Sequence, residues 1–230
     1  AQELSAPGVT LVLVGRDATR LNAVADICRA NGAKATPKVL DITIEDDCKS
    51  YLAQVDKEHQ FDLVLPCAGV AFGRETEDLA RLTTDTNVNG VLNTLQAIEP
   101  GMIARGRGQI GLISSLAGFR VLGGPPAYAA SKAWVRLYGE ALRGRLARKG
   151  VGVTVICPGF VDTPMVDPKT RDSLNNKLVP ADVAARKIVK ALERNQARLC
   201  FPLGMSLRAW WLALQPAWMS DRRARRNRKS

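Results

Sequence analysis

The chain is poor in the residues that several common kinds of active site need. It holds one histidine, His59, in a polar run that is typical of a surface turn. A Ser-His-Asp triad elsewhere in the chain therefore has no candidate base. The five cysteines are scattered and form no CxxC pair, which argues against a zinc site and against a disulfide framework. Such thiols indicate a reduced, cytoplasmic protein.

Long apolar runs are also lacking. No stretch reaches the length of a membrane-spanning helix, although 46% of the 230 residues are hydrophobic. This length is sufficient for one α/β domain with a full core. We find no internal repeat and no linker, so we predict one domain over residues 1–202, followed by two short segments.

Charge is uneven, because much of the net charge of +11 lies in the basic tail, residues 220–230. The basic residues of the tail are not interleaved with aromatic ones, so we expect no nucleic-acid partner. Contact with anionic lipid stays open.

The segment just before the tail, residues 203–219, holds three of the four tryptophans. Arg208 and Pro216 make it too poor a membrane span. We therefore predict an amphipathic segment that covers a substrate cleft or rests peripherally on a membrane surface, the latter suiting a lipophilic substrate. Packing on its own domain or on a partner subunit is the alternative.

Strand-like and helix-like segments alternate along the domain. The expected strands cover residues 9–14, 34–40, 61–65, 109–114, 151–156 and 198–201. The expected helices cover residues 18–31, 45–58, 77–104, 127–148 and 180–194. This alternation predicts an α/β fold with a doubly wound parallel sheet in a three-layer αβα arrangement. Ligands of such folds bind beyond the carboxyl ends of the strands.

Three side chains with complementary chemistry fall near one of these strand ends. Tyr128 and Lys132 are four residues apart, so a helix would place them on one face. Ser115 follows a buried strand and would reach the same cleft. Lowering the pKa of a tyrosine by about 3 units needs about 4 kcal/mol, which a cation about 4 Å away can supply. The three residues together therefore predict proton transfer to or from a substrate oxygen. Tyr128 and Lys132 alone could instead belong to an ordinary amphipathic helix.

Further motifs stand around this trio in a recognisable order. They are Asn87-Val-Asn-Gly90, Ser115, Tyr128-x-x-x-Lys132 and Pro158-Gly-Phe-Val-Asp-Thr163. With them the chain resembles the short-chain dehydrogenase/reductase family over nearly its whole length. The resemblance implies a Rossmann-type fold and an NAD(P)-dependent oxidoreductase, such as a carbonyl reductase, acting on a small carbonyl or alcohol substrate. The alternatives are a non-catalytic binding or regulatory module on the same fold and a membrane-surface protein acting through its basic C-terminus.

The resemblance also implies a role for each matched residue. Tyr128 would be the general acid in reduction and the general base in oxidation, with its pKa lowered by Lys132. Lys132 would also bind the nicotinamide ribose, Ser115 would polarise the carbonyl and Asn87 would hold a water. The segment from Pro158 to Thr163 would line the nicotinamide side of the cleft. No metal is required.

Cofactor choice follows from the residues after the strand at 9–14. Family members that select NAD usually carry an acidic residue there, whereas this chain has Gly15 and then Arg16. An arginine can pair with the 2′-phosphate of NADP in fork geometry, so the resemblance implies NADP over NAD. The implied cofactor-binding residues are Arg16, Asp41, Ile42, Cys67, Ala68, Gly69, Tyr128, Lys132, Pro158, Gly159, Val161 and Thr163.

Two departures from the family pattern matter. Cys67-Ala68-Gly69 stands where the family has Asn-Ala-Gly, so one amide that ties the backbone is lost. The first strand and the glycine-rich phosphate loop are not in this sequence, which we expect to be N-terminally incomplete. The strands at 9–14 and 61–65 should then flank the position of the first strand and not bond to each other. The family often forms homodimers or homotetramers, and we expect one of these here.

Overall fold

The computed structural model describes residues 1–120, 124–166, 168–174, 178–216 and 218–219. Its strands are β1 (Thr10–Gly15), β2 (Lys34–Val39), β3 (Leu63–Val64), β4 (Gly108–Ile113), β5 (Val151–Pro158) and β6 (Arg198–Phe201). Its α-helices are α1 (Ala18–Ala30), α2 (Glu45–His59), α3 (Glu77–Thr84), α4 (Gly90–Arg105), α5 (Pro126–Leu146), α6 (Pro168–Ser173), α7 (Ala181–Glu193) and α8 (Leu203–Ala213). Short 3₁₀ turns are η1 (Gln2–Leu4), η3 (Leu116–Gly118) and η4 (Ala147–Lys149), and η2 (Asp85–Asn89) is a π-turn.

The strands form two parallel sheets. β1 pairs with β2, while the other sheet has the order β3-β4-β5-β6. Within the described chain no ladder joins β1 to β3, which agrees with the predicted separation of these two strands.

The central strands of the larger sheet are more deeply buried than β1. Residues of β4 and β5 are largely inaccessible, whereas Leu11 to Gly15 are only partly covered.

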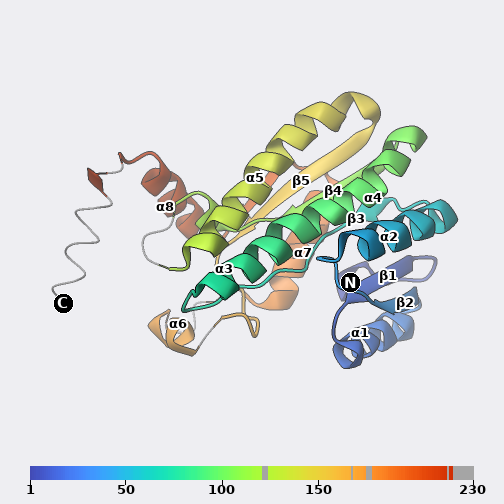
Figure 1. Cartoon of the computed structure of the whole chain (residues 1–230), viewed down its shortest axis with the longest axis horizontal. Helices are drawn as coiled ribbons and strands as arrows, with labels where there is room; N and C mark the ends of the chain where they lie inside the picture. The colour runs from blue at the N-terminus through green and yellow to red at the C-terminus, as the bar shows by residue number, and fades with distance from the viewer. Residues whose placement is uncertain (121–123, 167, 175–177, 217, 220–230) are drawn as a thin grey trace.

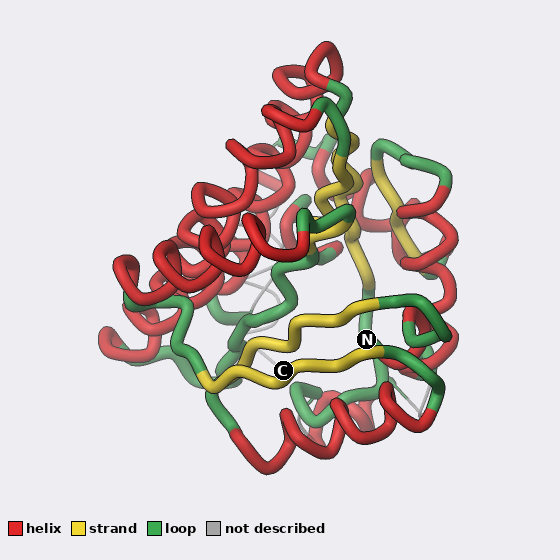
Figure 2. Tube along the Cα trace, turned by 90° about the vertical axis from the view of Figure 1, so that its right-hand side faces the viewer, coloured by secondary structure: helices red, strands yellow, loops and turns green. Residues whose placement is uncertain are grey.

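Helices cover both faces of the larger sheet, as Figures 1 and 2 show. On one face α2, α4 and α5 bury an apolar cluster against β4 and β5, with Leu95, Met102 and Val135 at its centre. On the other face α7 packs through Ala184 against Ile156. The smaller sheet is covered by α1, whose Ala25 and Cys28 are fully buried. The α/β, doubly wound architecture is therefore confirmed.

Several element boundaries have local causes in the sequence. Asp17 caps α1 by accepting a hydrogen bond from the Arg20 backbone N–H at 3.0 Å. Gly32 ends the same helix region with φ +91°, where a Cβ would lie 2.9 Å from the Pro7 ring. The predicted strand at 61–65 is shorter than expected, because only Leu63 and Val64 join the ladder. Before β1, residues Gln2–Leu4 form only the 3₁₀ turn η1.

The single helix predicted over residues 77–104 is three consecutive pieces. Between α3 and α4 the π-turn η2 widens the helix at Asp85–Asn89 and carries Asn87, which is completely buried. The sequence of η2 contains no glycine or proline that would mark a break in the helix. Hydrophobic periodicity alone therefore could not predict the π-turn. Such a turn inserts one extra residue and is frequent at functional sites.

The C-terminal part is described as far as residue 219. Residues 203–213 form α8, and the predicted basic tail at 220–230 lies outside the described residues. Among the helices that the structure describes, none combines the length and apolar character that crossing a bilayer requires.

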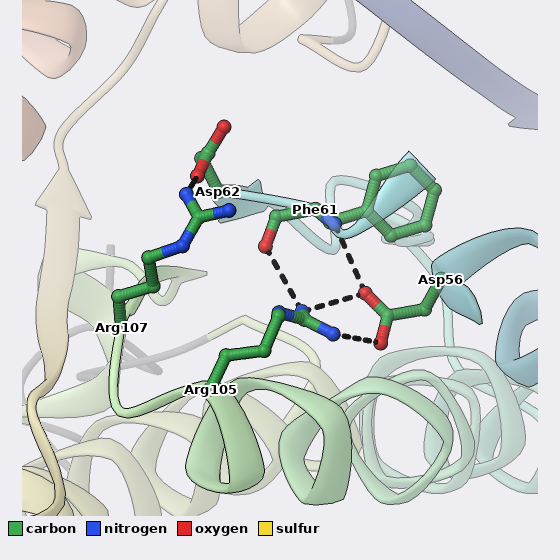
Figure 3. Close-up of polar contacts among 5 residues, drawn as sticks. All are labelled: Asp56, Phe61, Asp62, Arg105 and Arg107. Carbon is green, nitrogen blue, oxygen red and sulfur yellow. Dashed lines mark hydrogen bonds and ion pairs between the residues drawn. The ribbon is translucent and has the colours of Figure 1, made fainter. Parts of the chain in front are cut away.

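A buried ion pair ties α2 to the end of α4 (Figure 3). Asp56 accepts hydrogen bonds from Arg105 at 2.8 and 2.9 Å and from the Phe61 backbone N–H at 3.0 Å. The side chains of Asp56 and Arg105 are only 5% and 18% exposed. The approach depends on Gly101, because a Cβ there would lie 2.1 Å from an Asp56 carboxylate oxygen. This pair fixes the end of α4 from which the chain enters β4.

Removing the buried carboxylate should therefore destabilise the fold. We expect Asp56→Ala to lower the free energy of unfolding by about 3 kcal/mol, since it leaves the Arg105 charge largely buried and unpaired. The neighbouring ion pair of Arg107 with Asp62, also drawn in Figure 3, is 57% and 77% exposed and serves as the control. Asp62→Ala should cost less than about 1 kcal/mol. Urea titration measures both, and equal losses would contradict this account.

Candidate active site

The carboxyl ends of β4 and β5 bring together the predicted site residues. Ser115 lies two residues after the end of β4, and its hydroxyl donates to the carbonyl of Pro158 at the end of β5 at 3.4 Å. The same oxygen accepts from the backbone N–H of Ala117 at 3.1 Å. Ser115 is thereby held between two strand ends by backbone partners, and its position does not depend on a flexible side-chain contact.

The helix α5 is fastened to this strand end at Lys132. The hydroxyl of Ser114, which is buried, donates to the Lys132 carbonyl at 2.6 Å. A Cβ on Gly118 would lie 2.7 Å from the same carbonyl oxygen, so any side chain there would push α5 away from η3. Glycine at residue 118 allows close backbone contact and sets the distance from Ser115 to α5.

The N-terminus of α5 has a cap that the sequence did not reveal. Pro125 precedes the helix and offers no side-chain acceptor. Glu75, far away in sequence, accepts instead from the backbone N–H of Ala127 at 2.8 Å. A carboxylate at this end satisfies a free N–H and suits the helix dipole. Glu75 thus helps to place Tyr128, one residue further on, and only the tertiary structure identifies it.

Tyr128 is partly buried, and its phenol is hydrogen-bonded to Ser115. Burial raises the pKa of Tyr128, and the hydrogen bond with Ser115 opposes this only in part. The predicted lowering of this pKa by Lys132 is wrong for the structure as it stands. The main reason is that burial disfavours the charged phenolate. In addition, the Lys132 ammonium lies 5.8 Å from the centre of the phenol ring. The phenol is therefore protonated at neutral pH.

Lys132 is almost fully buried and donates from Nζ to the Ile113 carbonyl at 3.0 Å. Burial lowers the pKa of Lys132 to about 8, an effect that the nearby Cys67 thiol opposes. Nζ lies 3.5 Å from the position that a Cβ on Gly69 would occupy. The ammonium group is thus enclosed by the ends of β3 and β4, beside the phenol.

Asn87 faces the same point from the π-turn η2. Its Oδ1 accepts from the Val70 backbone N–H at 2.8 Å, and its Nδ2 donates to the Val70 carbonyl at 3.0 Å and to Ser131 at 3.1 Å. These contacts tie the loop after β3 to α5. Both ends of the Asn87 amide are thus bonded to protein partners. The predicted role of Asn87 in holding a water stays a prediction.

A second group of predicted residues lines a cavity of about 200 Å³ at the ends of β1 and β2. Arg16, Asp41, Ile42, Ala68 and Gly69 all contribute, joined by Val14, Gly15, Leu40, Val70 and Thr86. Arg16 pairs with Asp41 at 3.5 Å, while Thr43 donates to Asp41 from both its backbone and its hydroxyl. Despite burial, these partners together lower the pKa of Asp41.

One observation indicates that this cavity can take a polar ligand such as a nucleotide cofactor. The Thr86 hydroxyl is buried there without a hydrogen-bond partner in the described structure. Gly69 packs closely on Asn87 at the edge of the cavity, since a Cβ there would lie 3.2 Å from the Asn87 amide oxygen. No sequence motif identified Thr86, although it directly precedes Asn87.

The remaining predicted residues are less closely gathered. Cys67 is exposed just after β3 and is close enough to Lys132 to influence its charge. Gly159 packs against Met205 of α8 and donates its N–H to Phe201 at 2.7 Å. Val161 forms an isolated bridge with Val179, and the Thr163 hydroxyl donates to the Val161 carbonyl at 3.4 Å. These contacts hold the loop after β5 but place neither Val161 nor Thr163 in the cavity.

Metal chemistry has no candidate centre in the part of the chain that the structure describes. No group of three or more histidine, cysteine, aspartate or glutamate side chains is arranged there to hold an ion.

Comparison with known proteins identifies the class. A sequence profile described as short chain dehydrogenase matches residues 1–174. An uncharacterized oxidoreductase of Myxococcus xanthus is 35% identical over 230 residues, which cover 98% of this chain and 90% of that protein. Another, from Staphylococcus saprophyticus, is 34% identical over 82% of both chains. These are oxidoreductases by description, and this chain belongs to the short-chain dehydrogenase family.

Solved structures agree in fold. A short-chain dehydrogenase from Sphingobium yanoikuyae in complex with NADPH gives a TM-score of 0.80 at 22% identity, covering 98% of this chain and 87% of that one. A gluconate 5-dehydrogenase from Burkholderia cenocepacia, in complex with NADP and tartrate, gives 0.75 at 20% identity, covering 87% and 96%. At these identities the likeness shows the fold.

The buried ammonium of Lys132 makes stability depend on pH. Between its folded pKa of about 8 and its ordinary value of 10.5, the unfolded chain binds more protons than the folded one. The contribution of Lys132 to stability therefore rises with pH across this window. Relative to Lys132→Met, which cannot titrate, wild type should gain about 3 kcal/mol in free energy of unfolding between neutral pH and pH 10.5. Urea titrations at both pH values test this.

The matched control is Lys34→Met, at an exposed lysine. Its difference from wild type should stay constant over the same range. If the difference between wild type and Lys132→Met also stayed constant, Lys132 would not be desolvated as the structure indicates.

Proposed function

We propose that the protein reduces a carbonyl compound with NADPH, with Tyr128 as the group that transfers the proton. One observation carries this proposal: Ser115, Tyr128 and Lys132 lie together beside the ends of β4 and β5, where backbone contacts hold Ser115 and Lys132. Family membership supports hydride transfer as the type of reaction. The choice of NADPH and the role of Tyr128 are our inference.

The proposed roles follow from the state of each group. The Ser115 hydroxyl holds the substrate oxygen, and the protonated Tyr128 phenol gives it a proton as the carbonyl carbon is reduced. Burial raises the pKa of the phenol, which therefore carries its proton at neutral pH and can act as the acid in reduction. The Lys132 ammonium, placed beside the phenol, stabilises the phenolate when it forms. When bound, NADPH supplies the hydride.

The cofactor would lie along the carboxyl ends of the strands. Arg16 and the cavity at Asp41, Ile42 and Gly69 would hold the adenosine end, and Lys132 with Pro158 would flank the nicotinamide end. The Arg16 guanidinium is 55% exposed and its pairing with Asp41 is long, so it is available for a 2′-phosphate. This supports NADP over NAD.

The substrate is proposed to be a small carbonyl or alcohol compound with apolar character. Phe160 and Met165, in the loop after β5, are 40% and 50% exposed, which favours a lipophilic ligand. Assembly as a homodimer or homotetramer and a cytoplasmic location stay predictions, as does the alternative of a non-catalytic module.

Replacing the phenol tests the central assignment. Full-length Tyr128→Phe should lose at least about 10²-fold in kcat/KM with NADPH and a carbonyl panel, because it keeps the ring but has no transferable proton. Tyr138→Phe is the matched control, since Tyr138 is on the same helix and stacks on Trp134 at 4.6 Å. It should retain wild-type turnover.

Two results would count against the proposal. Wild-type turnover in Tyr128→Phe would remove this residue from the reaction. Tight NADPH binding without turnover of any carbonyl would favour a binding module instead.

The 2′-phosphate role of Arg16 predicts a selective loss. A charge-assisted hydrogen bond contributes about 1.5–3 kcal/mol, so Arg16→Ala should weaken NADPH binding by more than about tenfold and leave NADH binding nearly unchanged. Lys34→Ala removes the same charge at the opposite end of β2 and should affect neither. Equal losses for NADPH and NADH, measured by fluorescence titration, would refute this role.

A further inference from the structure

The helix α8 has two different apolar faces. Its inner face packs on the domain through Met205 and Ala209, which join a cluster with Leu116 and Cys157. Trp210 meets the ring of Phe119 edge-on, with centroids 6.4 Å apart. The amphipathic segment predicted from the sequence therefore does pack on its own domain, beside the end of β5. That accounts for only one side of the helix.

The outer face carries an exposed apolar ridge. Its members are Leu203, Leu207, Trp211 and Leu214, with exposed fractions of 69%, 53%, 55% and 85%. Their spacings of four, four and three residues place them on one stripe of the helix. Trp218, just beyond, is 54% exposed. A continuous stripe of this kind marks an interaction surface, unlike singly scattered apolar side chains.

Charge identifies the partner that this ridge fits. Arg208 is exposed within the helix, and six of the last nine residues are basic. The basic residues are Arg222, Arg223, Arg225, Arg226, Arg228 and Lys229. Leucine and tryptophan next to a basic run in the sequence match the acyl boundary and the anionic headgroups of a bilayer.

We propose that the outer face of α8 docks on an anionic lipid bilayer and lies in the plane of its interface. The leucines enter the acyl boundary, the tryptophans sit at the headgroup level, and the positive charge of the basic C-terminal sequence attracts the anionic surface. Because the inner face contacts Gly159, docking brings the β5 end of the candidate site close to the lipid. The proposal does not depend on catalytic activity.

Sedimentation of the full-length protein with vesicles tests the proposal. The vesicles are phosphatidylcholine alone or equal parts phosphatidylcholine and phosphatidylglycerol, at low and at high salt. We expect wild type to pellet with the anionic vesicles at low salt and to be partly released at high salt. Leu207→Glu should lower the partition coefficient by about tenfold or more, because a side chain that enters the bilayer becomes charged.

The matched control is Leu137→Glu, since Leu137 on α5 is 56% exposed, close to the 53% of Leu207. It should bind like wild type, and circular dichroism confirms that both variants fold. Replacing the six basic residues of the tail by glutamine should weaken binding to anionic vesicles and remove its salt dependence.

Three results would overturn the proposal. The first is wild type that stays in the supernatant with anionic vesicles at low salt. The second is equal binding of Leu207→Glu and wild type. The third is a dimer in analytical ultracentrifugation that Leu207→Glu dissociates, without vesicle binding, which would make a second copy the occupant of the ridge.

Discussion

The close contact between η3 and α5 is the constraint on which the candidate site depends. Ser115 belongs to the end of β4, whereas Tyr128 and Lys132 belong to a helix that begins after a loop. The hydrogen bond from Ser114 to the Lys132 carbonyl, and the absence of a side chain at Gly118, bring these two parts into register. Glu75 fixes the start of the same helix. The reactive side chains are thus placed by backbone contacts, which vary little with side-chain motion.

Burial in the cleft acts in opposite directions on the two ionisable groups. It raises the pKa of the Tyr128 phenol and lowers that of the Lys132 ammonium, so each is pushed toward its neutral form. Pairs of groups whose protonation is tuned by their surroundings are a feature of sites that move protons. The same desolvation reduces stability, which the fold offsets through large apolar clusters on both faces of its main sheet.

Much of this could be predicted from the sequence, for identifiable reasons. Alternating apolar strands and amphipathic helices specify a doubly wound fold, and strand ends in such folds meet at one edge, so Ser115 and Pro158 could be placed together. The direction in which the pKa of Tyr128 shifts could not be predicted, because desolvation depends on the packing of segments distant in sequence. Glu75 and Thr86 were missed because neither belongs to a motif. The exposed ridge on α8 was visible as an apolar segment, but only coordinates separate its inner from its outer face.

The π-turn at Asp85–Asn89 makes chain length at this point matter more than composition. It inserts one extra residue into the helix, and Asn87 within it is completely buried. Deleting one residue here would let α3 run into α4 as a regular helix, and everything on the α3 side would rotate by about 100° around the axis. Insertions and deletions in this stretch should therefore be tolerated far less than substitutions at its exposed positions.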